Sequence, residues 1–186
     1  MSPALEILYV TNTPLTGPLP PMNNALQSLS IRDTQITGSI ENWPSTMMTG
    51  YCERSGLNGI IDSLPSGLTE LYIDDTDLYG TLPALPPVMT TLFANNAFLS
   101  GALPAFPSSL IDFRVPDNDF DHEIPALPTG LLRLNVARNR LSGSIPALPE
   151  SLEEIAVYSN RLSGTVPAIP FGTSHVYIHD LSLIHI

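Results

Sequence analysis

The sequence predicts a β-solenoid with a parallel sheet on its concave side and a proline-rich convex side that is almost free of helix. Three observations support this fold. A 21-residue unit recurs eight times without an insertion, apolar residues two apart in each unit indicate a strand, and proline and glycine keep fixed columns. A unit this short cannot bury its own apolar edge, so successive units must stack on one another.

Each unit opens with three apolar columns. In the seventh unit they are Leu131, Leu134 and Val136. The last two are separated by one residue, and side chains alternate across a strand, so both should face the core while the residue between them faces outward. The leading column recurs every 21 residues, at Leu5, Leu26, Met47, Leu68, Met89, Leu110, Leu131 and Leu152.

The second half of each unit is built from turn residues and further apolar columns. A glycine column, interrupted only by His122, predicts a backbone with positive φ or a close approach that a Cβ would obstruct. Two proline positions per unit remove amide donors and break any helix. The third unit is the most degenerate, because Gly50 stands where a leucine belongs, and we predict a local packing defect there.

The complete pattern, LxxLxVxxNxLSGxIPALPxS, resembles the leucine-rich repeat. Its LSGxIP half is similar to plant-type repeats, and its LPxSLxxLxV junction is similar to the short repeats of secreted bacterial effectors. Threonine at the asparagine position, together with TGPLP and YGTLP, resembles repeats of protist surface proteins; these residues are Thr13, Thr34 and Thr76. The resemblance implies a right-handed leucine-rich-repeat superhelix and, for function, a receptor or inhibitor ectodomain or a secreted effector.

We predict a single domain over residues 1–180, with eight full repeats at 5–172 and a partial ninth at 173–180. Neither a signal peptide nor a polar cap precedes the first repeat, so the terminal units should expose apolar edges. The last six residues, LSLIHI at 181–186, match a translation of a transposon-library adapter. We therefore predict a non-native tail on a fragment from a metagenomic assembly; the alternative is a tail that pairs as a last strand.

Composition excludes several classes of function. The net charge is -11, and the seven basic residues are all arginines, which argues against binding to nucleic acid phosphates. No run of about 18 apolar residues is present, so this stretch of sequence contains no membrane span. The single cysteine, Cys52, lies in an inward column, where it is most simply a small core residue.

The concave face carries the candidate binding residues. Its central row reads Tyr9, Ser30, Tyr51, Tyr72, Phe93, Arg114, Asn135, Ala156 and Tyr177. Consecutive aromatic residues in this row should form a ladder of apolar anchors, and the variable columns beside it hold carboxylates to attract basic groups and arginines to attract acidic ones. The predicted ligand-binding residues are Tyr51, Tyr72, Phe93, Asp74, Asp75, Arg114, Asp117, Arg133, Arg138, Arg140 and Tyr158.

Other chemistry finds little support. Asp117, Asp119 and Asp121 imitate the start of a calcium loop, but His122 replaces its glycine and Pro128 its glutamate. His175 and His179 would share a metal only on a helix, because four residues of strand span roughly 13 Å. No histidine and carboxylate accompany a serine as a catalytic group. We therefore expect no metal, no cofactor and no enzymatic activity.

The sequence favours a non-enzymatic scaffold that recognises a protein or peptide, at the cell surface or outside the cell. Two alternatives stay open. A structural cell-surface repeat protein would also show polar outward rows, and cross-strand aromatic rows stabilise sheets without any ligand. A carbohydrate-binding or ice-binding solenoid would use flat rows of tyrosine or threonine, although the threonine column is expected to point inward.

Overall fold

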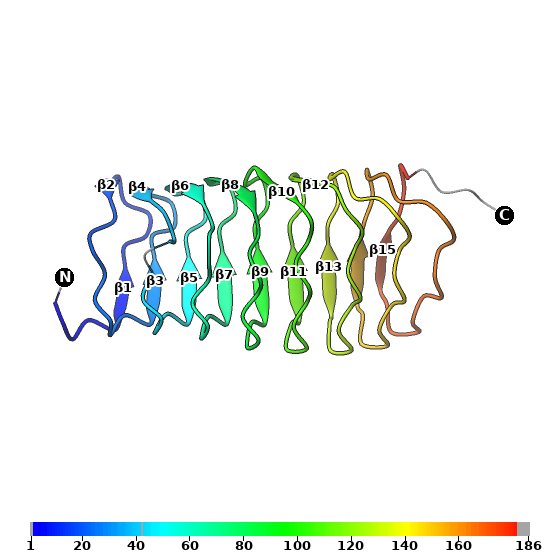
Figure 1. Cartoon of the computed structure of the whole chain (residues 1–186), viewed down its shortest axis with the longest axis horizontal. Coiled ribbons are helices and arrows are strands. Elements are labelled where there is room, and N and C mark those ends of the chain that lie inside the picture. Colours follow the sequence, from blue (N-terminus) through cyan, green and yellow to red (C-terminus); the bar gives the residue numbers. More distant parts are fainter. Residues whose placement is uncertain (1, 42, 182–186) are drawn as a thin grey trace.

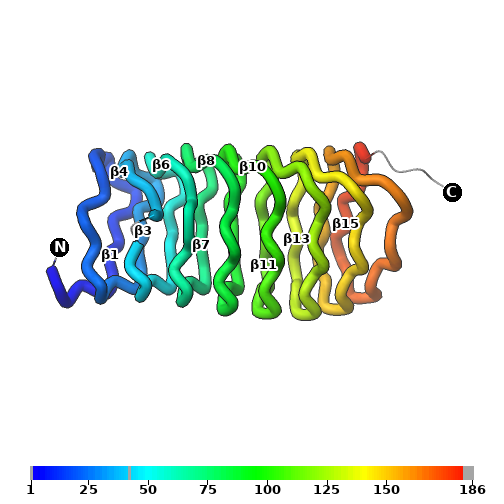
Figure 2. Tube along the Cα trace, in the orientation of Figure 1, coloured from blue at the N-terminus to red at the C-terminus, as the bar shows by residue number. Residues whose placement is uncertain are grey.

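The computed structural model describes residues 2–41 and 43–181. Successive turns of the chain stack side by side along one long axis, with the first units at one end and the last at the other (Figure 1). The Cα trace shows each turn as a flattened loop lying against the next (Figure 2). One parallel sheet runs the length of this stack and a second covers its first six turns, and no helix occurs in the described ranges.

The larger sheet has nine strands, one from each turn, paired in parallel with a register of 21 residues. Leu71 therefore lies beside Leu92, and Tyr72 beside Phe93. This confirms the predicted parallel sheet and its register. The strands, in order across the sheet, are β1 (Ile7–Tyr9), β3 (Ser28–Ser30), β5 (Thr49–Tyr51), β7 (Glu70–Tyr72), β9 (Thr91–Phe93), β11 (Asp112–Arg114), β13 (Arg133–Asn135), β14 (Glu154–Ala156) and β15 (His175–Tyr177).

The second sheet has six strands, and the sequence did not predict it. It forms where the glycine column approaches the neighbouring turn, and its register is 19 residues, as in Asn58 beside Asp77. At Gly143 an added Cβ would lie 2.8 Å from Glu123 Cγ, so glycine is needed for close approach, and its φ of 78° also fits the prediction. The strands are β2 (Thr16–Pro18), β4 (Gln35–Gly38), β6 (Gly56–Ile60), β8 (Asp77–Thr81), β10 (Leu99–Gly101) and β12 (Asp119–Phe120).

The core lies between the two sheets and repeats in every inner turn. In the fourth unit, Leu68, Leu71, Ile73 and Leu78 are all completely buried, whereas Tyr72 between them is only half-buried. The predicted inward columns are therefore confirmed. Each buried leucine or isoleucine contributes roughly 1.5–3 kcal/mol of burial free energy, and stacking supplies that burial to every inner unit.

An inward polar column joins adjacent turns. The side-chain amides of Asn118, Asn139 and Asn160 donate to backbone carbonyls of their own turn and of the turn before, and their Oδ1 atoms accept from backbone N–H groups of the preceding turn. Among the earlier turns, the first, second and fourth carry threonine, the third carries Ser55 and the fifth Ala97. Thr34 and Thr76 are buried, as predicted, and each hydroxyl donates to one carbonyl, that of Ile31 or Ile73.

The predicted packing defect at Gly50 is wrong. An added Cβ at Gly50 would lie 2.5 Å from Cη2 of the Trp43 indole, which occupies the space that the leucine fills in other turns. Trp43 belongs to a later column of the preceding unit, where most other turns carry leucine. The large Trp43 side chain in one inward column therefore compensates for the missing side chain at Gly50 in another, so the core of the third unit loses no volume.

The two ends of the stack expose apolar side chains, as predicted for uncapped units. Ile7 and Tyr9 are 57% and 60% exposed at one end, and Phe171 is fully exposed near the other. The predicted non-native tail at 181–186 lies outside the described residues except for Leu181. The domain boundary at residue 180 therefore stays a prediction.

Cys52 offers a test of how tightly the inner turns stay closed. It is completely buried, and burial raises the pKa of its thiol. Because the thiolate is the reactive form, we expect native Cys52 to react with a disulfide reagent at least about a hundredfold more slowly than in concentrated guanidinium. Fast labelling of the native protein, followed by absorbance, would instead show that the second and third units open locally.

Candidate binding face

The exposed side of the nine-stranded sheet, the concave face, presents four parallel rows of side chains. The first three consist of positions 7, 9 and 11 of the chain and their equivalents every 21 residues. The fourth, which we call the rim row, consists of residues with left-handed backbone, φ between 51° and 56°: Asn12, Asp33, Arg54, Asp75, Asn96, Asp117, Arg138, Ser159 and Asp180. Because neighbouring strands of the nine-stranded sheet keep the 21-residue register, every row is continuous along the stack.

The second row contains the aromatic ladder that the register predicts. The rings of Tyr51 and Tyr72 stack with centroids 5.1 Å apart, and Phe93 meets Tyr72 edge-on at 4.8 Å. The Arg114 guanidinium continues the ladder, with its Cζ 4.9 Å from the centre of the Phe93 ring. One face of Tyr51 and one of Phe93 are therefore covered within the ladder, by Tyr72 and Arg114.

Carboxylates surround this ladder. The Tyr51 hydroxyl donates to Glu70 Oε2 at 2.9 Å; burial, with this bond, raises the pKa of Tyr51. Asp74 Oδ1 accepts from the backbone N–H of Asn95 at 2.7 Å, yet partial burial of Asp74 raises its pKa. Two neighbouring acceptors, Glu53 Oε2 and Asn95 Oδ1, are buried without a hydrogen-bond partner in the described part of the chain.

The predicted arginines are engaged with carboxylates. Arg114 binds both oxygens of Asp112, at 2.8 and 3.1 Å, and the bond raises the pKa of Arg114. Arg133 contacts Glu153 at 2.8 Å and Asp112 at 3.6 Å. An acidic ligand at these positions would have to share or displace these partners. The Arg133–Glu153 pair is exposed and worth only about 0–1 kcal/mol, whereas Asp112 is buried.

The rim row forms its own ion pairs along the stack. Arg54 contacts Asp33 at 2.5 Å. Arg138 donates to both oxygens of Asp117 and to the Tyr158 hydroxyl, and its Cζ lies 5.3 Å from the Tyr158 ring centre. Asp75 accepts from Asn96 Nδ2 at 3.1 Å. The sequence reasoning missed this row's conformation, although its many Asn and Asp residues are the side chains that best tolerate left-handed backbone.

Arg140 is not brought together with the other predicted residues. Its backbone N–H donates to the Phe120 carbonyl in the ladder of the second sheet, and its guanidinium contacts Asp119 Oδ1 at 2.8 Å. It lies two positions beyond the rim row, past the inward Asn139, so alternation along a single strand did not apply to it.

Two pockets lie on the concave face, along the third to ninth turns. One, of about 360 Å³, lies against Asp74, Phe93, Asn95 and Arg114, and the other, of about 400 Å³, lies against Glu154, Tyr158, Tyr177 and His179. Asn135 lines both pockets, and we call the two together the trough. The outward rows carry Pro116 and Ala156 here, whose side chains are short.

Sequence reasoning did not select Asn95, Asn135, Glu154, Tyr177 or His179, all of which line the trough. The available signal was the small residues in the outward rows.

His179 stacks on Tyr158 with ring centres 4.6 Å apart and contacts Asp180 at 3.0 Å through Nδ1, while His175 lies in strand β15. Across residues 2–41 and 43–181, no cluster of three or more metal-ligating side chains and no membrane-spanning helix is found.

The chain matches no protein-family model and no curated protein. Solved structures do resemble it. A TDR receptor superposes with a TM-score of 0.84 at 26% identity, over 96% of this chain and 35% of that one. YopM from Yersinia enterocolitica WA-314 gives 0.75 at 25% identity, over 100% and 45%. YopM from Yersinia pestis, described as a leucine-rich effector protein, gives 0.72 at 28% identity, over 98% and 56%.

The chain is a leucine-rich-repeat protein. The repeat unit, the two parallel sheets and the superposition with leucine-rich-repeat structures agree on this point. This leucine-rich-repeat chain spans roughly a third to somewhat over half of the proteins just named. Its similarity to a receptor and to effectors supports a protein-binding repeat scaffold.

Proposed function

We propose that this leucine-rich-repeat protein is a non-enzymatic scaffold that binds an extended segment of a protein or peptide along its concave face. The observation that carries the proposal is the trough through Asn135, which the aromatic ladder borders at one end and Tyr158 and Tyr177 at the other. Aromatic residues and arginine are the types that dominate binding energy at protein interfaces.

The chemistry of the trough favours a ligand that offers hydrogen-bond donors at its ladder end. Asn95 and Asp74 line the trough, and Glu53 precedes them in the third row. Within residues 2–41 and 43–181, Glu53 Oε2 and Asn95 Oδ1 are buried acceptors without a donor. A basic side chain or a backbone amide of the ligand would satisfy these acceptors. We propose that Asp74, Asp75 and Asp117 attract basic groups, and that Arg133, Arg138 and Arg140 attract acidic groups by exchanging their present partners.

The kinds of protein that the chain resembles support such a role. One is a receptor and another is an effector. We infer by this similarity that the chain works outside the cell in which it is made, either as part of a receptor-like or inhibitor protein or as part of a secreted effector.

A carbohydrate ligand is the second candidate, and the ring geometry counts against it. Sugars stack on exposed ring faces, but Tyr51 and Tyr72 each cover one face of the other with ring centres 5.1 Å apart, and Arg114 lies over Phe93. Thr34 and Thr76 are buried, which counts against an ice-binding threonine row. A purely structural repeat protein would have no specific ligand for this face.

Tyr72→Ala should weaken binding of a peptide selected from a displayed random library about 10-fold to 100-fold, because it removes the central anchor of the ladder. Arg138→Ala should weaken peptide binding less, because it removes only the guanidinium that lies over the Tyr158 ring. Titration calorimetry with the purified peptide measures both effects, and a glycan array tests the carbohydrate candidate. Tyr79→Ala is the matched control, because Tyr79 is 55% exposed on the second sheet. Unchanged affinity in both concave-face variants, or an equal loss in Tyr79→Ala, would exclude the concave face.

A further inference from the structure

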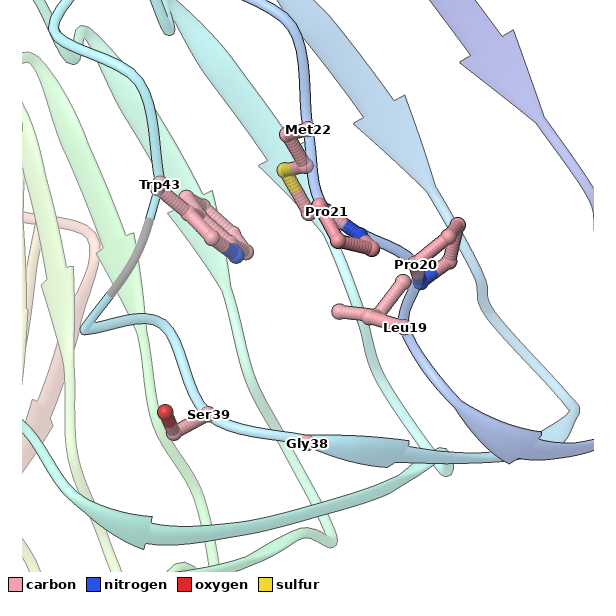
Figure 3. Close-up of a pocket in the computed structure, with 7 residues that line it drawn as sticks. All are labelled: Leu19, Pro20, Pro21, Met22, Gly38, Ser39 and Trp43. Atoms are coloured by element: carbon pink, nitrogen blue, oxygen red, sulfur yellow. The ribbon is translucent and has the colours of Figure 1, made fainter. Parts of the chain in front are cut away.

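A separate pocket of about 520 Å³ lies away from the concave face, between the first and second turns. One wall is the segment Leu19–Met22 of the first turn, and the opposite wall is Trp43, with Gly38 and Ser39 at one side (Figure 3). The volume is within the range typical of small-molecule sites, roughly 300–1,000 Å³.

The sequence of the third unit accounts for this pocket. Gly50 leaves space in the core, and the Trp43 indole fills it, with Cη2 2.5 Å from where a Cβ of residue 50 would be. Leu19 belongs to the first turn, which packs against a neighbouring turn on one side only. It is half-buried, whereas its equivalent in the second turn, Ile40, is only 1% exposed.

The pocket is lined by the side chains of Ser39 and Trp43 as well as by apolar residues, and Trp43 carries a buried polar group. Trp43 is 7% exposed, and its Nε1 is buried without a hydrogen-bond partner among residues 2–41 and 43–181. The indole nitrogen lies on the edge of the ring that faces Leu19 and Pro21 (Figure 3). The indole N–H is a donor only, and a buried donor without an acceptor is unfavourable. A ligand that supplies an acceptor would therefore gain binding free energy from this hydrogen bond.

We propose that this pocket binds a small, uncharged, largely apolar molecule that carries one accepting oxygen, which receives the hydrogen bond of Trp43 Nε1. The apolar part of the ligand packs on Leu19, Met22 and the indole face. The ligand is uncharged because none of the pocket's lining side chains carries a charge. This site is independent of the concave face and of its proposed ligand.

Two naphthalene probes of similar shape test the proposal. By equilibrium dialysis, the chain should bind 2-acetylnaphthalene about tenfold more tightly than 2-ethylnaphthalene, because only the ketone accepts a hydrogen bond. Binding of the ketone should also change the emission of Trp43, the single tryptophan of the chain. In Trp43→Phe the aromatic wall remains but the donor is gone, so the preference for the ketone should disappear.

A second pair of variants keeps the test decisive if Trp43→Phe fails to fold. Ser39→Leu should fill the pocket and lower affinity for the ketone at least about tenfold. Ser144→Leu, at the same repeat position five turns later, should leave affinity unchanged. Equal binding of the two probes, or equal binding by the Ser39→Leu and Ser144→Leu variants, would overturn the proposal. Binding of the probes at the exposed apolar ends of the stack, instead of in this pocket, would also overturn the proposal.

Discussion

Replacing Asn139 by alanine should lower the free energy of unfolding by about 3–5 kcal/mol. The Asn139 amide donates to the carbonyls of Val115, Val136 and Ala137 at 3.0–3.1 Å, and its Oδ1 accepts from Phe120 N–H at 3.0 Å. All of these bonds are buried. Removing the side chain leaves their backbone partners unsatisfied in two turns at once, and water cannot replace it inside the stack.

Urea unfolding followed by circular dichroism measures this loss. Asn139→Thr should fall between wild type and Asn139→Ala, because Thr34 and Thr76 show that a hydroxyl at this position satisfies one carbonyl. Asn96→Ala is the control, since in the described part of the chain the exposed Asn96 side chain bonds only to Asp75; alanine in its left-handed backbone should itself cost about 1 kcal/mol. If Asn139→Ala cost no more than this control, the asparagine column would not hold the turns together.

A double-mutant cycle at Trp43 and Gly50 should reveal a strong energetic coupling between the two side-chain positions. Gly50→Leu forces a side chain into the indole and should cost roughly 2–4 kcal/mol, and Trp43→Leu leaves a cavity of similar cost. The double variant restores leucine in both columns, as in most other turns. It should be destabilised by at least about 2 kcal/mol less than the sum of the single variants.

A thermal or urea unfolding cycle of the four proteins gives this coupling energy directly. Gly130→Leu is the control for adding a leucine, because no atom lies within 4 Å of where its Cβ would be, and it should be close to neutral. Additive effects of Trp43→Leu and Gly50→Leu would mean that the indole does not occupy the leucine position.

Much of the architecture could be predicted because each inward column repeats at a fixed spacing. Leu71 and Ile73 face the core and Tyr72 faces outward, as strand alternation requires. The second sheet was not predicted, because its strands coincide with the glycine and proline columns, which ordinarily indicate turns. The Trp43 and Gly50 exchange was missed because it joins columns of two different units, and a column-by-column comparison treats each position separately.

The candidate site could be predicted only in part. The ladder of Tyr51, Tyr72 and Phe93 follows from the register alone. The pairing of the arginines does not, because Arg138 reaches Asp117 only through the left-handed backbone of the rim row. The trough depends on where short side chains interrupt the outward rows, and a search for chemically active residues overlooks Pro116 and Ala156.

The constant register of both ladders has a consequence for how this molecule can change its length. Most inner turns meet their two neighbours through the same columns, so excising one complete turn, such as residues 89–109, would bring β7 beside β11 with equivalent partners. The second and third turns are the exception, because Trp43 of one fills the space at Gly50 of the other. A deletion of any other size would put core leucines on the surface. Insertions and deletions are thus tolerated only in whole turns. Each such change would lengthen or shorten the outward rows and leave the packing of the core unchanged.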